Sequence, residues 1–163
     1  MKRLLVVLFI FVGLFGIISC DKDDDSSTTP DPVDEWIGTW LSAGANVAPI
    51  LIAVFQYDSV KVEFKDNSTI TLKSHVTNGA WTTTEGTYTI TKATSGTVHT
   101  AKFVYPAFEQ EGIIEITAGT PSTMKLEVVQ TIPNIGATPR TPATGFGSDP
   151  ALGTANIQKY IKL

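Results

Sequence analysis

The side chains that could do chemistry are few and lie far apart along the chain. There is one cysteine, Cys20, and there are two histidines, His75 and His99. Nucleophilic catalysis needs a base beside the nucleophile, and a metal site needs ligands at a close spacing such as H-x-H. These residues form neither pattern. The sequence therefore predicts no catalytic residues, no metal site and no cofactor, and we expect that the protein is not an enzyme.

The remaining titratable candidates have simple structural interpretations. His75 shares a strand face with threonine and lysine side chains, which predicts an exposed ring. His99 shares a face with alanine and aromatic residues, which predicts a buried, hydrogen-bonded ring. Glu109 and Glu111 flank a turn, where they either pair as carboxylates or lie in solvent at a hairpin tip. No glycine-rich loop follows a strand and opens a helix, so we expect no phosphate site.

The start of the chain has the composition of a secretory signal peptide. Lys2 and Arg3 form a short basic region, and residues 4–18 form an apolar run without charge. About 20 residues are needed to cross a bilayer, so this run is too short to span one comfortably. We expect residues 1–19 to be a signal peptide that is removed on export.

Ser19 and Cys20 follow the apolar run directly, and they resemble the lipobox of bacterial lipoproteins. The resemblance implies cleavage before Cys20, which then carries lipid and anchors the protein to a membrane. Each buried methylene of the lipid contributes about 0.8 kcal/mol to anchoring. Ile17 and Ile18 depart from the leucine and small residue of the stricter pattern. The alternative is an uncleaved amino-terminal anchor in which the cysteine is incidental.

Residues 20–35 form a predicted tether that carries all the net charge of the mature chain. Residues 21–35 hold seven acidic residues and one lysine, a net charge of −6, whereas residues 36–163 hold nine acidic and nine basic residues. A segment this polar buries too little apolar surface to offset the entropy of ordering, so we expect disorder. The neutral remainder has no basic surface, so we expect no nucleic acid partner.

The tether begins with an acidic cluster: Asp21, Lys22, Asp23, Asp24 and Asp25. One interpretation is a solvated spacer that anionic headgroups repel. The other is a targeting signal, because an acidic cluster directly after a lipidated cysteine resembles the lipoprotein export signal of Bacteroidetes. That resemblance implies a lipid-anchored protein of the outer membrane, displayed at the cell surface.

Residues 36–163 are enough for one domain with a real core, and their pattern is typical of β-structure. β-branched and aromatic residues alternate with polar ones, and turn residues such as Asn78-Gly79 separate the segments. The run 50–57 is either a short helix or a buried strand. We expect strands at 36–42, 60–65, 70–76, 81–92, 98–105, 112–118, 124–130 and 157–163.

A meander of about eight strands must hide its edges, and closure into a barrel does so. In the last strand, Ile157, Ile161 and Leu163 share one face. The stretch 133–153 is rich in proline and glycine and forms a long loop that is either functional or mobile. Within it, Phe146 has three interpretations: a partner contact, a lid over the barrel mouth, or a side chain folded back onto the barrel.

Two short motifs resemble those of lipocalins and the wider calycin group. Gly38 and Trp40 match the Gly-x-Trp motif of the first strand, and Gly86 and Tyr88 match a strand of small bacterial lipocalin-like lipoproteins. The resemblance implies an all-β fold: an antiparallel, up-and-down, eight-stranded barrel whose closed end Trp40 plugs. The last strand offers only lysines where lipocalins often stack an arginine on that tryptophan, and the second lipocalin motif is absent.

Two classes of binding function remain, in addition to an enzymatic function, which we do not expect. The lipocalin resemblance implies a small apolar ligand at the open end of the barrel. The aromatic residues that would line such a cavity are Phe64, Trp81, Tyr88, Phe103 and Tyr105. Packed core is the ordinary alternative for each of them. A filled barrel would instead present the loop 133–153 to a partner, such as an outer-membrane complex, a glycan or a protease.

Overall fold

The computed structural model describes residues 33–163. The predicted signal peptide, Cys20 and the acidic cluster 21–25 lie outside the described residues. Within the described range, no helix is both long enough and apolar enough to span a membrane. The closed strand ladder and its core are complete within this range, which forms one compact unit. We therefore expect residues 33–163 to fold on their own.

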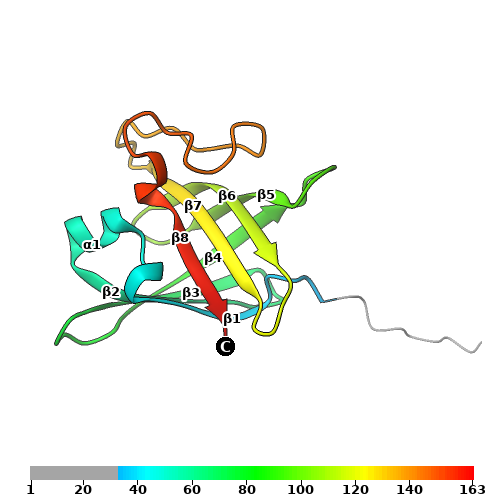
Figure 1. The fold of residues 1–163 in the computed structure, drawn as a ribbon. Coiled ribbons are helices and arrows are strands. Elements are labelled where there is room, and N and C mark those ends of the chain that lie inside the picture. Colours follow the sequence, from blue (N-terminus) through cyan, green and yellow to red (C-terminus); the bar gives the residue numbers. More distant parts are fainter. Residues whose placement is uncertain (1–32) are drawn as a thin grey trace, which may run out of the picture. The chain divides into compact units, whose positions relative to one another are not determined.

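Eight antiparallel strands form a closed barrel in the order of the sequence, and the last strand pairs with the first (Figure 1). The strands are β1 (Gly38–Ala43), β2 (Tyr57–Phe64), β3 (Thr69–Val76), β4 (Thr82–Thr91), β5 (Val98–Val104), β6 (Glu109–Thr117), β7 (Thr123–Ile132) and β8 (Gln158–Lys162). Alternation sets their faces, as in β2, where Val60, Val62 and Phe64 are buried and the residues between them are half-exposed. The prediction of an all-β, lipocalin-like barrel of eight up-and-down strands is confirmed.

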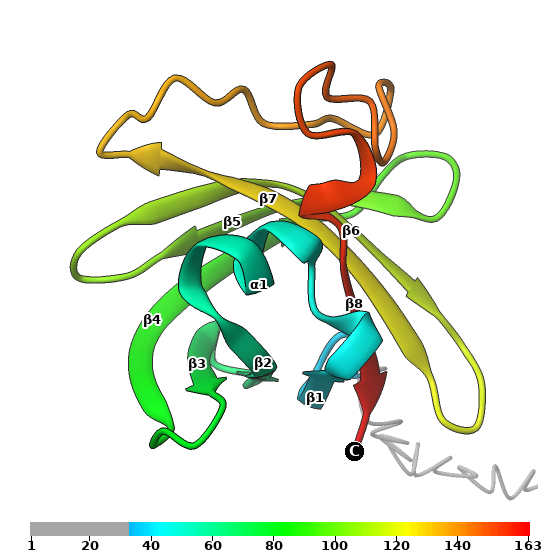
Figure 2. The same cartoon turned by 60° about the vertical axis from the view of Figure 1, so that its left-hand side comes forward.

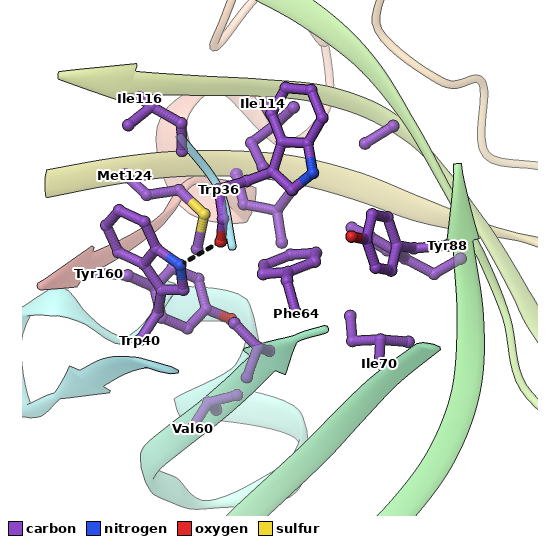
Figure 3. Packing of buried hydrophobic residues seen from close by; sticks show 14 of the residues in the cluster. Trp36, Trp40, Val60, Phe64, Ile70, Tyr88, Ile114, Ile116, Met124 and Tyr160 are labelled. Carbon is purple, nitrogen blue, oxygen red and sulfur yellow. Dashed lines mark hydrogen bonds between the residues drawn. The ribbon is translucent and has the colours of Figure 1, made fainter. Parts of the chain in front are cut away.

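Side chains fill the end of the barrel at which β1 begins and β2 ends, which we call the closed end (Figure 3). Trp40 is fully buried there, and its indole Nε1 donates a hydrogen bond to the Trp36 carbonyl oxygen at 2.7 Å. The rings of Phe64 and Tyr88 meet edge to face with centroids 5.0 Å apart. The Tyr88 hydroxyl donates to the Lys65 carbonyl oxygen at 2.7 Å. Two tryptophans, rather than one, thus fill the closed end.

The surroundings of Trp40 explain the glycine two positions before it. Lys162 of β8 places its Nζ 5.1 Å from the centroid of a Trp40 ring, as in a cation–π contact. The same side chain passes over Gly38, where its Cε would lie 3.0 Å from an added Cβ. Gly38 also has a φ of 123°, which L side chains rarely adopt. A lysine of the last strand thus lies over the Trp40 ring.

The barrel makes contacts before the expected boundary at Trp36. Asp34 forms an ion pair with Lys92 at 2.6 Å, and Glu35 Oε1 lies 3.2 Å from His99 Nε2. Trp36 is 4% exposed, although it precedes the first strand. Asp34 and Glu35, which the sequence assigns to the tether, thus contact the barrel. Burial of the adjacent Trp36 ring in the closed end brings both residues against the barrel.

The opposite end of the barrel, here called the open end, carries most of the non-strand structure. It is bordered by η1 (Gly44–Asn46), α1 (Pro49–Phe55) and the segment 133–157, which includes η2 (Gly153–Asn156) (Figure 2). Of the run 50–57, residues 50–55 thus form the helix of the two predicted alternatives, and Tyr57 begins β2. Pro49 stands in the first turn of α1, where its missing N–H has no helical partner to lose, and Gln56 ends the helix with a φ of 57°.

The long loop packs against the outer face of the barrel. Glu127, on the outer face of β7, is 1% exposed, and its Oε2 accepts a hydrogen bond from the Gly147 N–H at 2.7 Å. Ile113 of β6 is fully buried although it lies outside the main core cluster. Lys125 Nζ lies 5.0 Å from the centroid of the Phe146 ring. Of the three interpretations of Phe146, the structure has the one in which it folds back onto the barrel.

The face of β8 that holds the aliphatic residues points outward. Ile161 and Leu163 are 39% and 68% exposed, whereas Gln158 and Tyr160 are buried. The Tyr160 ring joins the core cluster beside Trp40 (Figure 3). A tyrosine ring offers a large apolar area for burial, so β8 turns Tyr160 inward and leaves its aliphatic neighbours outside.

Gly112→Ala should destabilise the barrel by about 1–3 kcal/mol, the usual cost of forcing atoms into a packed site. A Cβ added at Gly112 in β6 would overlap the carbonyl oxygen of Glu127 on the paired strand β7. A backbone oxygen held in a strand ladder cannot swing aside as a flexible side chain would. Urea unfolding measures the effect, with Thr100→Ala at an exposed position of β5 as the control. Equal midpoints for the two variants would contradict the close approach.

Candidate functional site

A cavity of about 330 Å³ lies in the open half of the barrel. That volume is at the lower end of the range for small-molecule pockets, roughly 300–1,000 Å³. Its walls come from α1, β2, β3, β5, β6, β7, β8, η2 and the turn between β5 and β6. The cavity therefore collects side chains from both halves of the sequence.

The floor of the cavity is apolar. Val62, Ile70 and Phe103 line it and are each 2% exposed or less. The Phe103 ring contacts the Phe64 ring, with centroids 6.0 Å apart. Phe64 is the next inward residue of β2 toward the closed end, so it lies below the floor. The packed closed end thus supports the cavity from beneath.

The mouth of the cavity lies beside α1. Leu51, Tyr57, Gln110 and Gln130 line it and are half-buried, and Phe55 lines it with its side chain 53% exposed. The rings of Phe55 and Tyr57 stack with centroids 5.4 Å apart and an angle of 20° between their planes. These lining residues reach solvent, so the cavity faces solvent at the open end.

Among the described residues that line the cavity, none is charged. The polar lining residues are Ser74, Gln110, Gln130, Asn156, Gln158, Tyr57, Tyr105 and Tyr160. Burial raises the pKa of the Tyr105 hydroxyl above its ordinary value, and it does the same for Tyr160. Both hydroxyls therefore stay protonated and neutral at physiological pH. The cavity offers an apolar guest neutral hydrogen-bonding groups and no ionic partner.

The structure separates the five aromatic residues predicted to line a cavity. Phe103 and Tyr105 do line it. Phe64 and Tyr88 are buried in the core toward the closed end and are not among its lining residues. Trp81 lies outside the cavity and is 43% exposed, because it precedes β4 and packs on the outer surface. Its ring centroid is 5.1 Å from that of His75.

Several lining residues have no counterpart in the sequence prediction. Leu51 and Phe55 come from a helix, and Gln158 and Tyr160 come from the inward face of β8. The alternation of Gln158 and Tyr160 with lysine and isoleucine was the available signal for β8. For the helix, no periodic signal exists, because one strongly apolar run without polar residues fits either secondary structure.

The two histidines are both hydrogen-bonded. His75 is half-buried, and its Nδ1 lies 2.7 Å from Asp58 Oδ1. That hydrogen bond is the largest cause that lowers the pKa of Asp58. His99 is 7% exposed, and its Nδ1 accepts a hydrogen bond from the Ala93 N–H at 3.1 Å. In the neutral ring Nε2 then carries the proton and donates to Glu35. The predicted buried, hydrogen-bonded His99 is confirmed, and His75 is less exposed than predicted.

Glu109 and Glu111 do not form a carboxylate pair. Lys102 Nζ lies 2.8 Å from Glu109 Oε2 and 3.1 Å from Glu111 Oε1. These contacts, with Glu109 first, raise the pKa of Lys102. The two carboxylates thus share a cation on the barrel surface. Within residues 33–163, no group of three or more histidine, cysteine or acidic side chains is placed to hold a metal ion.

Comparison with known proteins gives no relative to set beside this geometry. No family model matches the chain, no curated protein matches it, and no solved structure matches it. The closed barrel and its cavity are therefore the observations on which a function can be argued.

Proposed function

We propose that this protein is a cell-surface lipoprotein whose lipocalin-like barrel binds a small apolar ligand and catalyses no reaction. The observation that carries the proposal is the cavity, which has an apolar floor and a mouth beside α1. Each Å² of apolar surface that a guest and the walls remove from water contributes about 25 cal/mol. A guest without charge therefore gains most from this site.

The amino-terminal segment gives the barrel its proposed location. The basic, apolar and Ser19-Cys20 elements of the sequence support export and lipid attachment at Cys20. The acidic cluster 21–25 supports an outer-membrane address at the cell surface. In this arrangement the lipid holds the protein at the membrane, and the barrel is free to collect its ligand there.

A second candidate function is non-catalytic binding of a protein or glycan by the loops of the open end. The observation that favours it is the apolar surface of α1, where Ile52, Val54 and Phe55 are 44%, 61% and 53% exposed. The adjoining loop 133–153 would extend such a surface. On this alternative, shortening the loop abolishes partner binding, and blocking the cavity has no effect.

Native mass spectrometry tests the ligand directly. Residues 33–163 are incubated with a lipid extract of the protein's own cells, and a reproducible mass adduct is expected. Leu72→Trp should remove the adduct, because Leu72 of β3 lines the cavity and the larger ring would fill it. Lys73→Trp is the matched control, since the next residue of the strand points to the outer face.

Circular dichroism must show that both tryptophan variants are folded. A native mass equal to that of the protein alone would argue for a filled or unliganded barrel. Binding partners of the open-end loops would then be the next candidates. An adduct that survives in Leu72→Trp would show that the molecule binds elsewhere on the domain. Either result would contradict the cavity as the ligand site.

A further inference from the structure

We infer that the buried end of the ligand is uncharged and carries a hydrogen-bond acceptor, such as a ketone or ester oxygen, which the side-chain amide of Gln158 receives. This inference rests on the proposed function and narrows it to neutral, oxygen-bearing apolar molecules. Gln158 stands on the inward face of β8, is 4% exposed and lines the cavity. Because Gln158 is buried, the hydrogen bonds that its side-chain amide makes inside the barrel determine what it can bind.

The backbone fixes which way the Gln158 amide points. The Ala48 N–H lies 2.9 Å from Gln158 Oε1, and a backbone N–H can only donate. The oxygen must therefore face Ala48, and the NH₂ group must be the free end. That Nε2 is buried and has no hydrogen-bond partner among the described residues. Buried polar groups are almost always hydrogen-bonded, so an acceptor oxygen in the cavity would complete the site.

The neighbouring hydroxyls reinforce a site that donates hydrogen bonds. Tyr105 and Tyr160 line the same cavity and are 5% and 3% exposed. As protonated phenols they can donate to an oxygen of the guest. Gln130 contributes less, because its Nε2 already donates to the Pro133 carbonyl oxygen at 3.0 Å. The free donors thus come from the buried wall rather than from the mouth.

The same wall disfavours an ionised ligand end. None of the described lining residues is charged, so a carboxylate or ammonium group would be buried without a counterion. Burial of an isolated charge is far more costly than burial of a neutral polar group that finds a hydrogen bond. A charged end would have to remain at the mouth, where it could not use Gln158.

Competition against a fluorescent apolar probe, N-phenylnaphthylamine, tests the inference on residues 33–163. The competitors are undecanone, undecane and decanoate, which have similar length and differ in their polar end. Undecanone is expected to displace the probe at a concentration at least about tenfold lower than ionised decanoate. Gln158→Met should weaken undecanone by about five- to tenfold, the effect of one neutral hydrogen bond, and leave undecane within about twofold.

Gln158→Glu, assayed at a pH high enough to ionise its carboxyl, is the second variant: the carboxylate keeps an oxygen for the Ala48 N–H and has no proton to donate, whereas a protonated carboxyl would replace the NH₂ donor with an O–H. This variant must show the same loss for undecanone, and Lys159→Met on the outer face must show none. A loss confined to Gln158→Met would indicate disturbed packing at Ala48 and would overturn the inference. Unchanged undecanone binding in both variants, or decanoate binding as tight as undecanone, would also overturn it while the proposed function stands. If neither the probe nor any competitor binds, the proposed function fails and the inference fails with it.

Discussion

Replacement of Trp40 by alanine is expected to cost about 3–5 kcal/mol of unfolding free energy, the range for large aromatic residues truncated in a core. The ring is fully buried at the closed end of the barrel. Its removal would leave a void, deprive the Trp36 carbonyl of its donor, and take the ring from beneath the Lys162 amine. These losses meet at the point where β1 pairs with both β2 and β8, so closure of the barrel depends on them.

Guanidinium titration of residues 33–163, followed by circular dichroism, measures this cost. Trp81→Ala is the matched control, because that ring is 43% exposed and packs on the outer surface. Its replacement should cost less than about 1 kcal/mol, as for most surface changes. An equally small cost for Trp40→Ala would mean that the buried indole does not hold the closed end together.

The strands could be predicted from the sequence because the pattern that defines them is local. In β2 the apolar residues recur at every second position, and the register of the barrel turns that period into an inner and an outer face. The Asn78-Gly79 pair marks the turn into β4, where Asn78 adopts a φ of 62°. Strand order followed from the same facts, since a meander of such strands removes its edges only by closing.

Features that depend on contacts with residues distant in sequence could not be predicted. The apolar pattern of α1 is compatible with a helix and with a strand, and only its surroundings at the open end decide between them. At the last strand the outer side holds Ile161, whereas the inner face of β8 holds Tyr160, whose ring packs in the core cluster with Trp40. Trp36 shows the same limit, because its burial comes from packing in the closed end rather than from any strand period.

The cavity was harder to predict than the fold. A core and a cavity wall have the same apolar alternation, so sequence pattern does not tell Phe64, which is below the floor, from Phe103, which lines it. The difference lies in how many side chains reach the same space from opposite strands. The polar donors were missed for a related reason: the free amide of Gln158 is defined by its contact with Ala48, 110 residues away in sequence.

Replacement of Cys20 by alanine is expected to abolish lipid attachment completely, because in the proposed function the Cys20 thiol accepts the lipid and the chain has no second cysteine. Cells grown with an alkyne-tagged fatty acid should label the wild-type protein and leave the variant unlabelled. Loss of the acyl chains removes about 0.8 kcal/mol of anchoring for each buried methylene. The effect on membrane retention of the processed protein should therefore be nearly all-or-none.

Two further variants distinguish lipid attachment from targeting to the cell surface. Ser19→Ala keeps a small residue before Cys20 and should be labelled like the wild type. Replacement of Asp23, Asp24 and Asp25 by asparagine should leave the label intact and reduce the protein's accessibility to protease added outside intact cells. Label at the wild-type level in Cys20→Ala would rule out lipid on that thiol, and a wild-type protein without label would favour the amino-terminal run as an uncleaved anchor. Unchanged surface accessibility after the asparagine replacements would instead make the acidic cluster a plain spacer, because the lipid alone would account for the location.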